Sequence, residues 1–374
     1  MNQRKTASSL SGQILKVFCL LMVMFSLCSP AAVRAEEADF RLTMLDVGQG
    51  LSILCETNGE YLLYDGGGRS HSSYVVAYLK KHGIDRLRYM IVSHYDEDHI
   101  AGLVGVLNTT EVDMILSPDY EADTKIYDSF RQMAEKGNVE EEHPEAGDSY
   151  QFGEADIQIL GPMNYDEADE NNDSLAVRIS TDEFSAVITG DAEFDEEADI
   201  VNSGLPLESD LYVVGHHGSS SSSSEELLDA MGASAAFISA GEDNSYGHPT
   251  EQTLEALNER GTDIYRTDLQ GEVTCTVSDG EISFSEQPAE VSVSDENQAW
   301  VENVSDENAV PEDSISDENT STGRNYVLNT NTKKFHYPDC KSVGQMKEKN
   351  RQEYTGTREE LIASGYDPCG NCNP

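Results

Sequence analysis

Four side chains that can bind metal ions are concentrated in one short segment, Ser93–His99, which reads Ser-His-Tyr-Asp-Glu-Asp-His. The segment follows the apolar run Leu87–Val92, which predicts a buried strand, and precedes Ile100–Leu107, which predicts a helix. Open α/β sheets place their sites on such turns, beyond the carboxyl ends of strands. Because imidazole and carboxylate bind Zn²⁺ and Mn²⁺, the pairs His94/Asp96 and Asp98/His99 predict the beginnings of two adjacent metal sites. The alternative is an acidic, solvated loop with incidental histidines.

Further acidic and imidazole side chains follow other predicted strands. They are Asp46, Asp65, Asp191, His216, His217 and His248. A set of this kind, gathered beyond strand ends, favours a metal centre over the incidental loop. A bound cation lowers the pKa of water toward about 7, and two ions can hold the attacking and leaving oxygens of a phosphoryl displacement.

Strands and helices alternate from about residue 38 to 285, which predicts a layered α/β domain. Glycine-rich turns such as Asp65–Gly68 separate the predicted elements. The predicted helices are Tyr74–His82, Ala101–Leu107, Ile126–Lys136, Glu225–Met231 and Thr250–Arg260.

Residues 1–35 have the layout of a secretory signal peptide. Arg4 and Lys5 precede the apolar stretch Val17–Cys28, and Val33–Ala35 places small residues at a cleavage site. We therefore expect a secreted protein; an uncleaved anchor or association with the cell surface is the alternative. The hydrolase domain is predicted over residues 36–285.

The chain of 374 residues is strongly acidic, with 70 Asp and Glu against 24 Lys and Arg, for a net charge of −46. Such a charge repels polyanions at long range and argues against broad electrostatic binding of nucleic acid. Residues 286–323 contain acids but no Lys or Arg, and Ser-Asp-Glu-Asn occurs there three times at an eleven-residue spacing. This composition predicts an extended, disordered linker.

Residues 324–374 predict a small zinc module. His336 and Cys340 form one close pair of ligands, and Cys369 and Cys372 form a second. This spacing is typical of a closed structural zinc site, which would supply folding energy to a segment too short for an adequate core. The alternative, a disulfide, leaves one of the three cysteines over.

Two further cysteines, Cys55 and Cys275, lie in strand-like runs of the main domain. They either pair in an oxidising compartment or remain buried thiols.

The motif order Asp-Gly-Gly, His-x-Asp-x-Asp-His, Thr-Gly-Asp-Ala-Glu and His-His-Gly-Ser resembles the metallo-β-lactamase fold superfamily. It resembles more closely the extracytoplasmic hydrolase domain of ComEC/Rec2 competence proteins. The matching segments are Leu45–Gly50, Ser93–His99, Asn172–Leu175, Thr189–Glu193, His216–Ser219, Tyr246–Pro249 and Arg266–Asp268. The resemblance covers roughly residues 40–284 and implies a four-layer αββα sandwich. We expect no transmembrane channel of the ComEC type in this chain.

The resemblance also implies roles for individual residues. One metal ion would bind to His94 and Asp96, and the other to Asp98 and His99. Asp191 would bridge the two ions, and His216 would complete the second site, with His217 as a substrate contact or alternative ligand.

The remaining implied roles concern catalysis, orientation of the ligands and substrate binding. The predicted catalytic residues are Asp98, His217 and His248; the residues predicted to orient the ligands are Asp46, Asp65, Asn172 and Asp173; the predicted substrate contacts are Ser219, Asn244 and Tyr246. Asp96 and the Asn172/Asp173 pair stand where many superfamily members have histidine. This harder ligand set makes Mn²⁺ as plausible as Zn²⁺.

Residues 329–374 resemble the zinc-binding module of the DNA-repair protein Ada, in which a cysteine occupies the position of His336 and accepts methyl groups. Methyl transfer is therefore not expected here, whereas contact with the DNA backbone is. The candidate phosphate contacts are Lys333, Lys334, Lys341, Lys347, Lys349, Arg351 and Arg358. A solvated basic face is the alternative reading of these residues.

Together these features predict a secreted, monomeric, two-metal phosphodiesterase, a ComEC-like nuclease acting on DNA, with a tethered zinc module that helps to hold nucleic acid. The alternatives are a phosphodiesterase acting on a cell-envelope polymer and a DNA-capture protein without catalytic activity.

Overall fold

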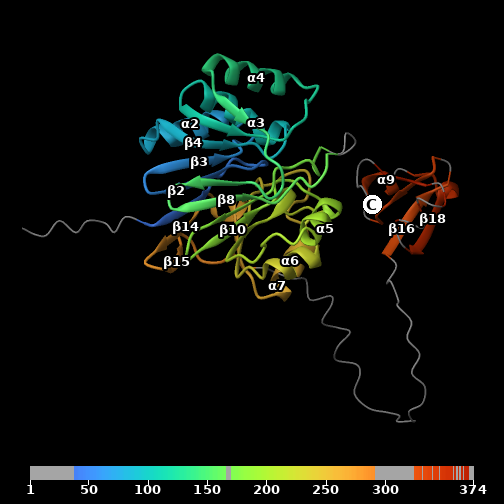
Figure 1. Ribbon diagram of the computed structural model, residues 1–374. Helices are drawn as coiled ribbons and strands as arrows, with labels where there is room; N and C mark the ends of the chain where they lie inside the picture. The colour runs from blue at the N-terminus through green and yellow to red at the C-terminus, as the bar shows by residue number, and fades with distance from the viewer. Residues whose placement is uncertain are drawn as a thin grey trace, which may run out of the picture. The chain divides into compact units, whose positions relative to one another are not determined.

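Two β-sheets packed face to face, with helices on both outer surfaces, make up the larger unit of the computed structural model (Figure 1). The structure describes residues 38–165, 170–290, 324–330, 332–338, 340–344, 346–356, 358, 361, 364 and 366–369. The predicted signal peptide, most of the predicted linker and Cys372 lie outside these residues. The chain divides into two compact units between Val291 and Ser292.

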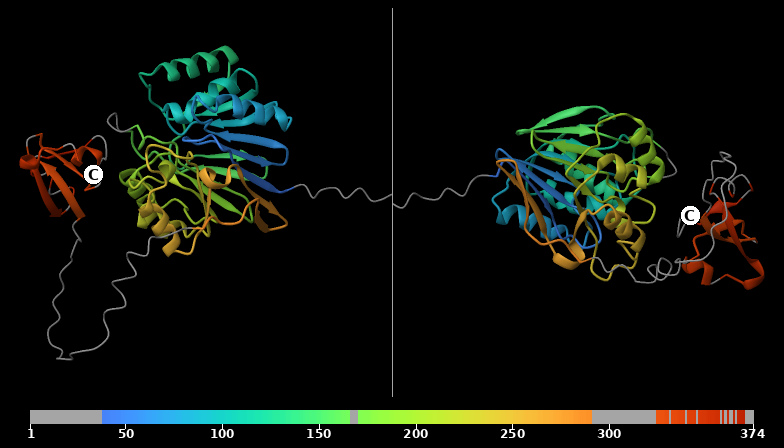
Figure 2. Two further views of the ribbon diagram at one scale, coloured as in Figure 1. Left: turned by 180° about the vertical axis from the view of Figure 1, so that it is seen from behind. Right: turned by 90° about the horizontal axis from the view of Figure 1, so that it is seen from below.

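The first sheet has eight strands in the order β15-β14-β1-β2-β3-β4-β5-β6. They are β1 (Phe40–Met44), β2 (Ile53–Thr57), β3 (Glu60–Tyr64), β4 (Arg86–Ile91), β5 (Glu111–Leu116), β6 (Glu140–Glu142), β14 (Val273–Ser278) and β15 (Glu281–Phe284). Strands β3 to β6 are parallel to one another, and the other pairings are antiparallel. Figure 2 shows the late strands β14 and β15 beside β1, at the start of the domain.

The second sheet has seven strands in the order β13-β12-β11-β10-β9-β8-β7. They are β7 (Ser149–Phe152), β8 (Ala155–Ile159), β9 (Val177–Ser180), β10 (Ser185–Ile188), β11 (Leu211–Val213), β12 (Ala235–Ile238) and β13 (Asp263–Arg266). Strands β10 to β13 are parallel. Each sheet therefore contains a parallel block, and the carboxyl ends of its strands lie along one edge.

Helices cover the outer face of each sheet (Figure 1). Helices α2 (Ser72–Lys81), α3 (Glu97–Leu107) and α4 (Lys125–Gly137) pack on the first sheet, and α5 (Phe194–Asn202), α6 (Glu225–Met231) and α7 (Glu251–Glu259) pack on the second. Two short helical segments, η1 (Gly215–Gly218) and α8 (Thr267–Gln270), follow β11 and β13. These layers confirm the four-layer αββα sandwich.

Strand side chains alternate between the inter-sheet core and the helix-covered faces. On β2, Ile53 and Cys55 enter the core between the sheets, whereas Leu54 faces the helices. On β10, Ala186 and Ile188 enter the inter-sheet core and Val187 packs against the helices. Because both faces are buried, these strands read as continuous apolar runs in the sequence.

Cys55 and Cys275 are both buried free thiols. Leu42 of β1 pairs with Cys55 of β2 on one side and with Cys275 of β14 on the other. The two cysteines are therefore two strand spacings apart, roughly 10 Å, which is beyond the reach of a disulfide. The structure thus answers the question that the sequence left open in favour of separate thiols.

The second unit contains a four-stranded sheet in the order β18-β16-β17-β19. Its elements are β16 (Arg324–Asn329), β17 (Lys334–His336), α9 (Lys341–Gly344), η3 (Glu348–Asn350), β18 (Arg351–Gly356) and β19 (Asp367–Pro368). Tyr326, Leu328, Phe335 and Leu361 form a small apolar core. Across the residues that the structure describes in both units, no helix is long and apolar enough to cross a membrane.

Candidate metal centre

The candidate ligands occupy the carboxyl ends of parallel strands in both sheets. Asp65 follows β3, His94 and Asp96 lie between β4 and α3, and Asp98 and His99 lie in the first turn of α3. Asp191 follows β10, and His216 and His217 follow β11. The sheet edges therefore bring together residues that are more than 100 positions apart in the sequence.

A glycine contact fixes helix α3 against the turn after β3. The Gly66 N–H donates to the His99 carbonyl, and the Gly102 N–H donates to the Gly67 carbonyl. A Cβ atom on Gly102 would lie only 1.8 Å from the Gly66 carbonyl oxygen, so a larger residue would displace the helix. This close approach positions the first turn of α3, which carries Asp98 and His99.

Two overlapping groups of potential ligands are present in the described part of this unit. One group is His94, His99 and Asp191, and the other is Asp98, His99 and His217; within each, the ligand atoms lie within 4.8 Å of one another. Asp96 extends the first group, because its Oδ2 lies 3.8 Å from His94 Nε2. Asp191 lies between the groups, with its Oδ2 3.3 Å from His99 Nε2 and 3.5 Å from His217 Nε2.

The buried atoms that face one another in these groups lack hydrogen-bond partners. They are the Nε2 atoms of His94, His99 and His217 and the Oδ1 atom of Asp191. A buried polar atom without a partner costs free energy, so four of them converging on one place need a compensating ligand. Imidazole and carboxylate are the ligands that divalent cations accept, so the residues fit two metal ions.

The outer nitrogens of the imidazoles are held by fixed acceptors. Asp65 is fully buried and accepts hydrogen bonds from the Ser93 N–H at 2.9 Å, from Ser93 Oγ at 2.6 Å and from His99 Nδ1 at 2.8 Å. His217 Nδ1 donates to the Ser239 carbonyl at 3.0 Å. Because Nδ1 donates to these acceptors in both rings, Nε2 is the nitrogen that faces the centre and is available to a cation.

Electrostatic interactions keep the carboxylates of the centre ionised. Although burial opposes ionisation, His99, His217 and His216 hold the pKa of Asp191 well below its usual value. Burial likewise opposes the ionisation of Asp98, but its interactions with His217 and His99 lower the pKa of this carboxyl. A hydrogen bond to His94 lowers the pKa of Asp96. The centre therefore offers negative charge to a cation at neutral pH.

The structure distinguishes the two adjacent histidines after β11. His217 is buried and lies 3.5 Å from Asp98 Oδ2, so it occupies the place that the sequence reading gave to His216. His216 lies 3.7 Å from Asp191 Oδ2 and turns its Nδ1 toward Glu193, at 3.3 Å. Both residues have positive φ, 48° and 57°, and this tight turn directs the two rings differently.

His248 borders the centre without joining either group. Its ring lies 5.7 Å from that of His216, and its buried Nδ1 has no hydrogen-bond partner. Burial, together with His216 and His217, lowers the pKa of His248 to about 4. This imidazole is therefore neutral near pH 7 and too weak a base to hold a proton there.

Other predicted residues support the loops around the centre. Asn244 accepts hydrogen bonds from the N–H groups of Tyr246 and His248, and Asn172 accepts one from the Glu193 N–H. The Ser219 hydroxyl bonds to that of Ser221. Asp173 is buried, and the Asp46 carboxylate accepts from the Gly48 N–H within its own turn.

Sequence reasoning missed four residues that hold side chains of the centre in place. Ser93 Oγ lies 3.0 Å from His94 Nδ1, and Ser174 Oγ accepts the Asp191 N–H. Glu193 contacts His216, and Ser239 provides the carbonyl for His217. Ser93, Ser174 and Glu193 lie within the matched motifs, so their positions next to predicted site residues could have indicated this role. Ser239 lies outside these motifs, and nothing in the sequence indicated its role.

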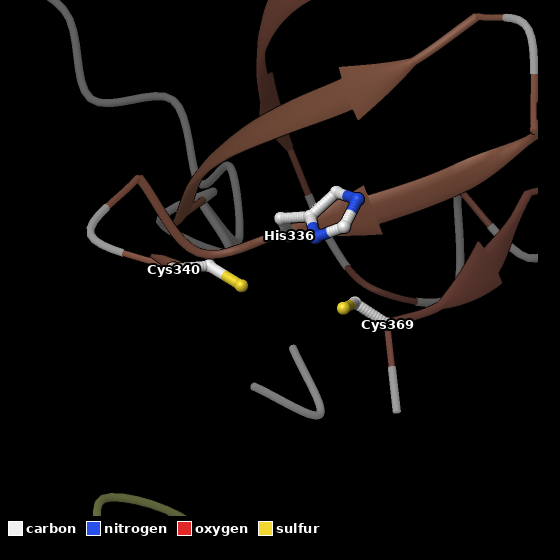
Figure 3. Close-up of side chains that lie close together, drawn as sticks. All are labelled: His336, Cys340 and Cys369. Carbon is white, nitrogen blue, oxygen red and sulfur yellow. The ribbon is translucent and has the colours of Figure 1, made fainter. Parts of the chain in front are cut away.

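A second candidate centre lies in the C-terminal unit (Figure 3). His336, Cys340 and Cys369 are buried, with ligand atoms within 4.8 Å of one another, and His336 Nδ1 lacks a hydrogen-bond partner. Parallel pairing of β17 with β19 brings Cys369 beside His336. Two thiols and an imidazole fit zinc, and the predicted fourth ligand, Cys372, lies outside the described residues.

The paired sheets, their flanking helices and the histidine–carboxylate centre at the strand ends define a metallo-β-lactamase fold. Residues 45–242 match the family described as "Metallo-beta-lactamase superfamily". The chain belongs to this superfamily, whose members are generally metal-dependent hydrolases that bind divalent ions, usually two.

The chain is also similar in sequence to competence proteins. It is 29% identical over 270 residues to "ComE operon protein 3" of Bacillus subtilis (strain 168), covering 67% of this chain and 35% of the relative. It is 32% identical over 254 residues to "Competence protein ComA" of Neisseria gonorrhoeae, covering 67% and 34%. The chain thus spans about a third of the length of these relatives.

Among solved structures, the metallo-beta-lactamase fold protein YhfI from Bacillus subtilis is 17% identical, with a TM-score of 0.43. The alignment covers 61% of this chain and 96% of that protein.

Proposed function

We propose that this protein is a secreted, metal-dependent phosphodiesterase that cleaves nucleic acid, with DNA as the first candidate. The observation that carries the proposal is the pair of ligand groups that share His99 and adjoin Asp191. Similarity to proteins named for competence supports a nucleic acid substrate, and the signal-like residues 1–35 support secretion.

The ligand set suits phosphodiester chemistry with Mn²⁺ or Zn²⁺. Bound divalent ions polarise phosphoryl oxygens and lower the pKa of water. His94, Asp96 and Asp191 would hold one ion, and Asp98, His99 and His217, with Asp191 shared, would hold the other. Three carboxylates among six residues make the centre harder than an all-imidazole site and therefore favourable to Mn²⁺.

The residues bordering the ligands can position substrate and exchange protons. His248 is neutral, and its buried Nδ1 can take part in a hydrogen bond with substrate. His216 is held between Asp191 and Glu193, and despite its burial these carboxylates raise the pKa of His216 to about 8. The ring centres of His216 and His248 lie 5.7 Å apart, so two imidazoles border the ligand groups and can contact substrate.

We further propose that the C-terminal unit is a zinc module that holds nucleic acid. His336, Cys340 and Cys369 would bind the ion, with Cys372 as the fourth ligand. Arg351 and other basic side chains are exposed on this unit, which carries less negative charge than the acidic main domain. A linker of the kind predicted from the sequence would raise the effective concentration of captured polymer near the catalytic unit.

Hydrolysis assays on the full chain test the main proposal. Labelled single- and double-stranded DNA is incubated with Mn²⁺, Zn²⁺ or a chelator. We expect metal-dependent cleavage that Asp191→Asn lowers by at least about 100-fold, because Asp191 adjoins both groups. Asp156→Asn, which alters an exposed carboxylate on β8, serves as the matched control and should behave as wild type. An inactive wild type with every metal would contradict the proposal.

Truncation at Thr322 tests the module. Nucleic acid affinity, measured by fluorescence anisotropy, should fall on truncation, and its dependence on salt should weaken because phosphate contacts are lost. Unchanged affinity would remove the proposed role of the module.

A further inference from the structure

Two tyrosine rings are exposed on loops that border the metal centre. Among the large apolar side chains of the described residues, only Tyr246, Leu269 and Tyr165 are exposed, at 69%, 60% and 43%. The other tyrosines of the described main domain are at least partly buried. The two exposed rings are therefore unusual among the described residues, and each is linked by its contacts to a different end of the ligand groups.

Tyr246 lies at the end formed by His216 and His217. Its ring is 5.7 Å from that of His248 at an interplanar angle of 31°, and His248 is in turn 5.7 Å from His216. The Asn244 carboxamide accepts the N–H groups of Tyr246 and His248 and donates to the His248 carbonyl. The loop is thus fixed by its own hydrogen bonds, while the tyrosine ring remains open to solvent.

Tyr165 is linked through Tyr120 to the other end, where His94 and Asp96 lie. Its hydroxyl accepts the Asp119 N–H at 2.9 Å, and its ring is 6.4 Å from that of Tyr120. Tyr120 accepts the N–H of Tyr95, the residue between His94 and Asp96. The ring is therefore anchored at its hydroxyl, while 43% of the residue stays exposed.

We propose that Tyr165 and Tyr246 each stack an unpaired base, one on either side of the phosphodiester that is cleaved, so that the protein prefers single-stranded nucleic acid. This inference rests on the proposed function. An aromatic ring can stack any base, but only when that base is released from its own duplex. Stacking also provides affinity for nucleic acid without the need for positive charge. This matters here because the chain has a net charge of −46 and few basic side chains.

The test compares an oligonucleotide with bases against one without them. The full chain, loaded with Mn²⁺, is assayed on a single-stranded oligonucleotide and on its duplex. The third substrate is the same strand with stable abasic sites in place of its nucleotides, so that no phosphodiester has a base on either side. For the normal strand, Tyr246→Ser and Tyr165→Ser should each raise KM by about 5- to 150-fold, the range of base stacking on one ring. Tyr246→Phe should retain the wild-type KM, because it keeps the ring.

The abasic strand and a control variant separate stacking from a general loss of structure. On the abasic strand, both serine variants should match wild type, whose own KM should already be high. Leu269→Ser, which removes an equally exposed apolar side chain from α8, should change neither KM. The inference would be overturned if wild type had equal KM values for the normal and abasic strands. It would also be overturned if the serine variants matched wild type on the normal strand. Neither result would contradict the proposed phosphodiesterase activity.

A binding measurement tests the inference independently of catalysis. Anisotropy of the labelled single strand in the presence of chelator should show weaker binding for both serine variants than for wild type and Tyr246→Phe. If wild type hydrolyses no phosphodiester, the proposed function fails, and this measurement alone decides whether the tyrosines bind bases.

Discussion

Replacement of Asp65 by Asn should weaken metal binding although Asp65 belongs to neither ligand group. Its Oδ2 accepts from His99 Nδ1 at 2.8 Å and from Ser93 Oγ at 2.6 Å, while Oδ1 accepts from the Ser93 N–H. Asn keeps the Oδ1 contact but presents an NH₂ group to His99. The imidazole must then accept at Nδ1, which moves its proton to Nε2, the atom that faces Asp191.

The expected loss follows from that proton. A protonated Nε2 cannot bind a cation, and loss of such an outer partner typically costs 10- to 100-fold in metal affinity, or about 1.4–2.7 kcal/mol. Isothermal titration with Mn²⁺ measures the affinity, since the thiol-rich C-terminal cluster prefers softer ions.

A variant of half-buried Asp210 controls for the loss of a carboxylate that accepts hydrogen bonds from a serine. Asp210 accepts the N–H and hydroxyl of Ser185, as Asp65 does those of Ser93, but it contacts no ligand of the centre. Asp210→Asn should lower the free energy of unfolding by about 1–3 kcal/mol while Mn²⁺ affinity remains unchanged. A folded Asp65→Asn variant that binds Mn²⁺ within twofold of wild type would refute the role assigned to Asp65.

Three further predictions follow from buried groups. Burial raises the pKa of Glu197 from 4.5 to about 7, so the folded state binds this proton more tightly than the unfolded state. The free energy of unfolding should therefore fall by up to about 3 kcal/mol as pH rises from 4.5 to 7. Urea denaturation at pH 5 and 7.5 measures this change, and the decrease between the two pH values should be smaller for Glu197→Gln than for wild type. Because Leu42 separates Cys55 from Cys275, alkylation after unfolding should label both thiols even in oxidised protein; a disulfide linking them in mass spectra would contradict the register. Cys369→Ser should remove one bound zinc ion per chain and abolish the dispersed amide signals of the C-terminal unit in NMR spectra. The urea transition of the main domain should stay unchanged. A variant that retains its zinc would contradict the proposed cluster.

The layered fold was predictable because its strands are buried on both faces and its motifs recur at strand ends. Elements with polar sequences were not. Helix α5 was missed because Glu196 and Glu197 face inward and hide the apolar stripe. Helix α3 begins at Glu97, earlier than predicted, since its first turn carries Asp98 and His99 in place of apolar residues.

The candidate site was predictable in its residue types but not in its finer assignments. The sequence cannot distinguish His216 from His217, because neighbouring histidines have the same chemistry and only the positive-φ turn directs one toward Asp98. The low pKa of His248 depends on its burial beside two other imidazoles, which are more than 30 positions away in the chain. Such properties arise from packing and require the structure.

The central claim is that the two ligand groups form one hydrolytic metal centre. The most direct measurement is the rate of phosphodiester cleavage in single-stranded DNA by the full chain and by the Asp98→Ala/His99→Ala variant, each with Mn²⁺, with Zn²⁺ and with chelator. We predict cleavage by wild type with at least one metal, none with chelator, and a loss of at least about 100-fold in the variant, which lacks ligands of both groups. A variant as active as wild type, or cleavage that persists in chelator, would contradict this account.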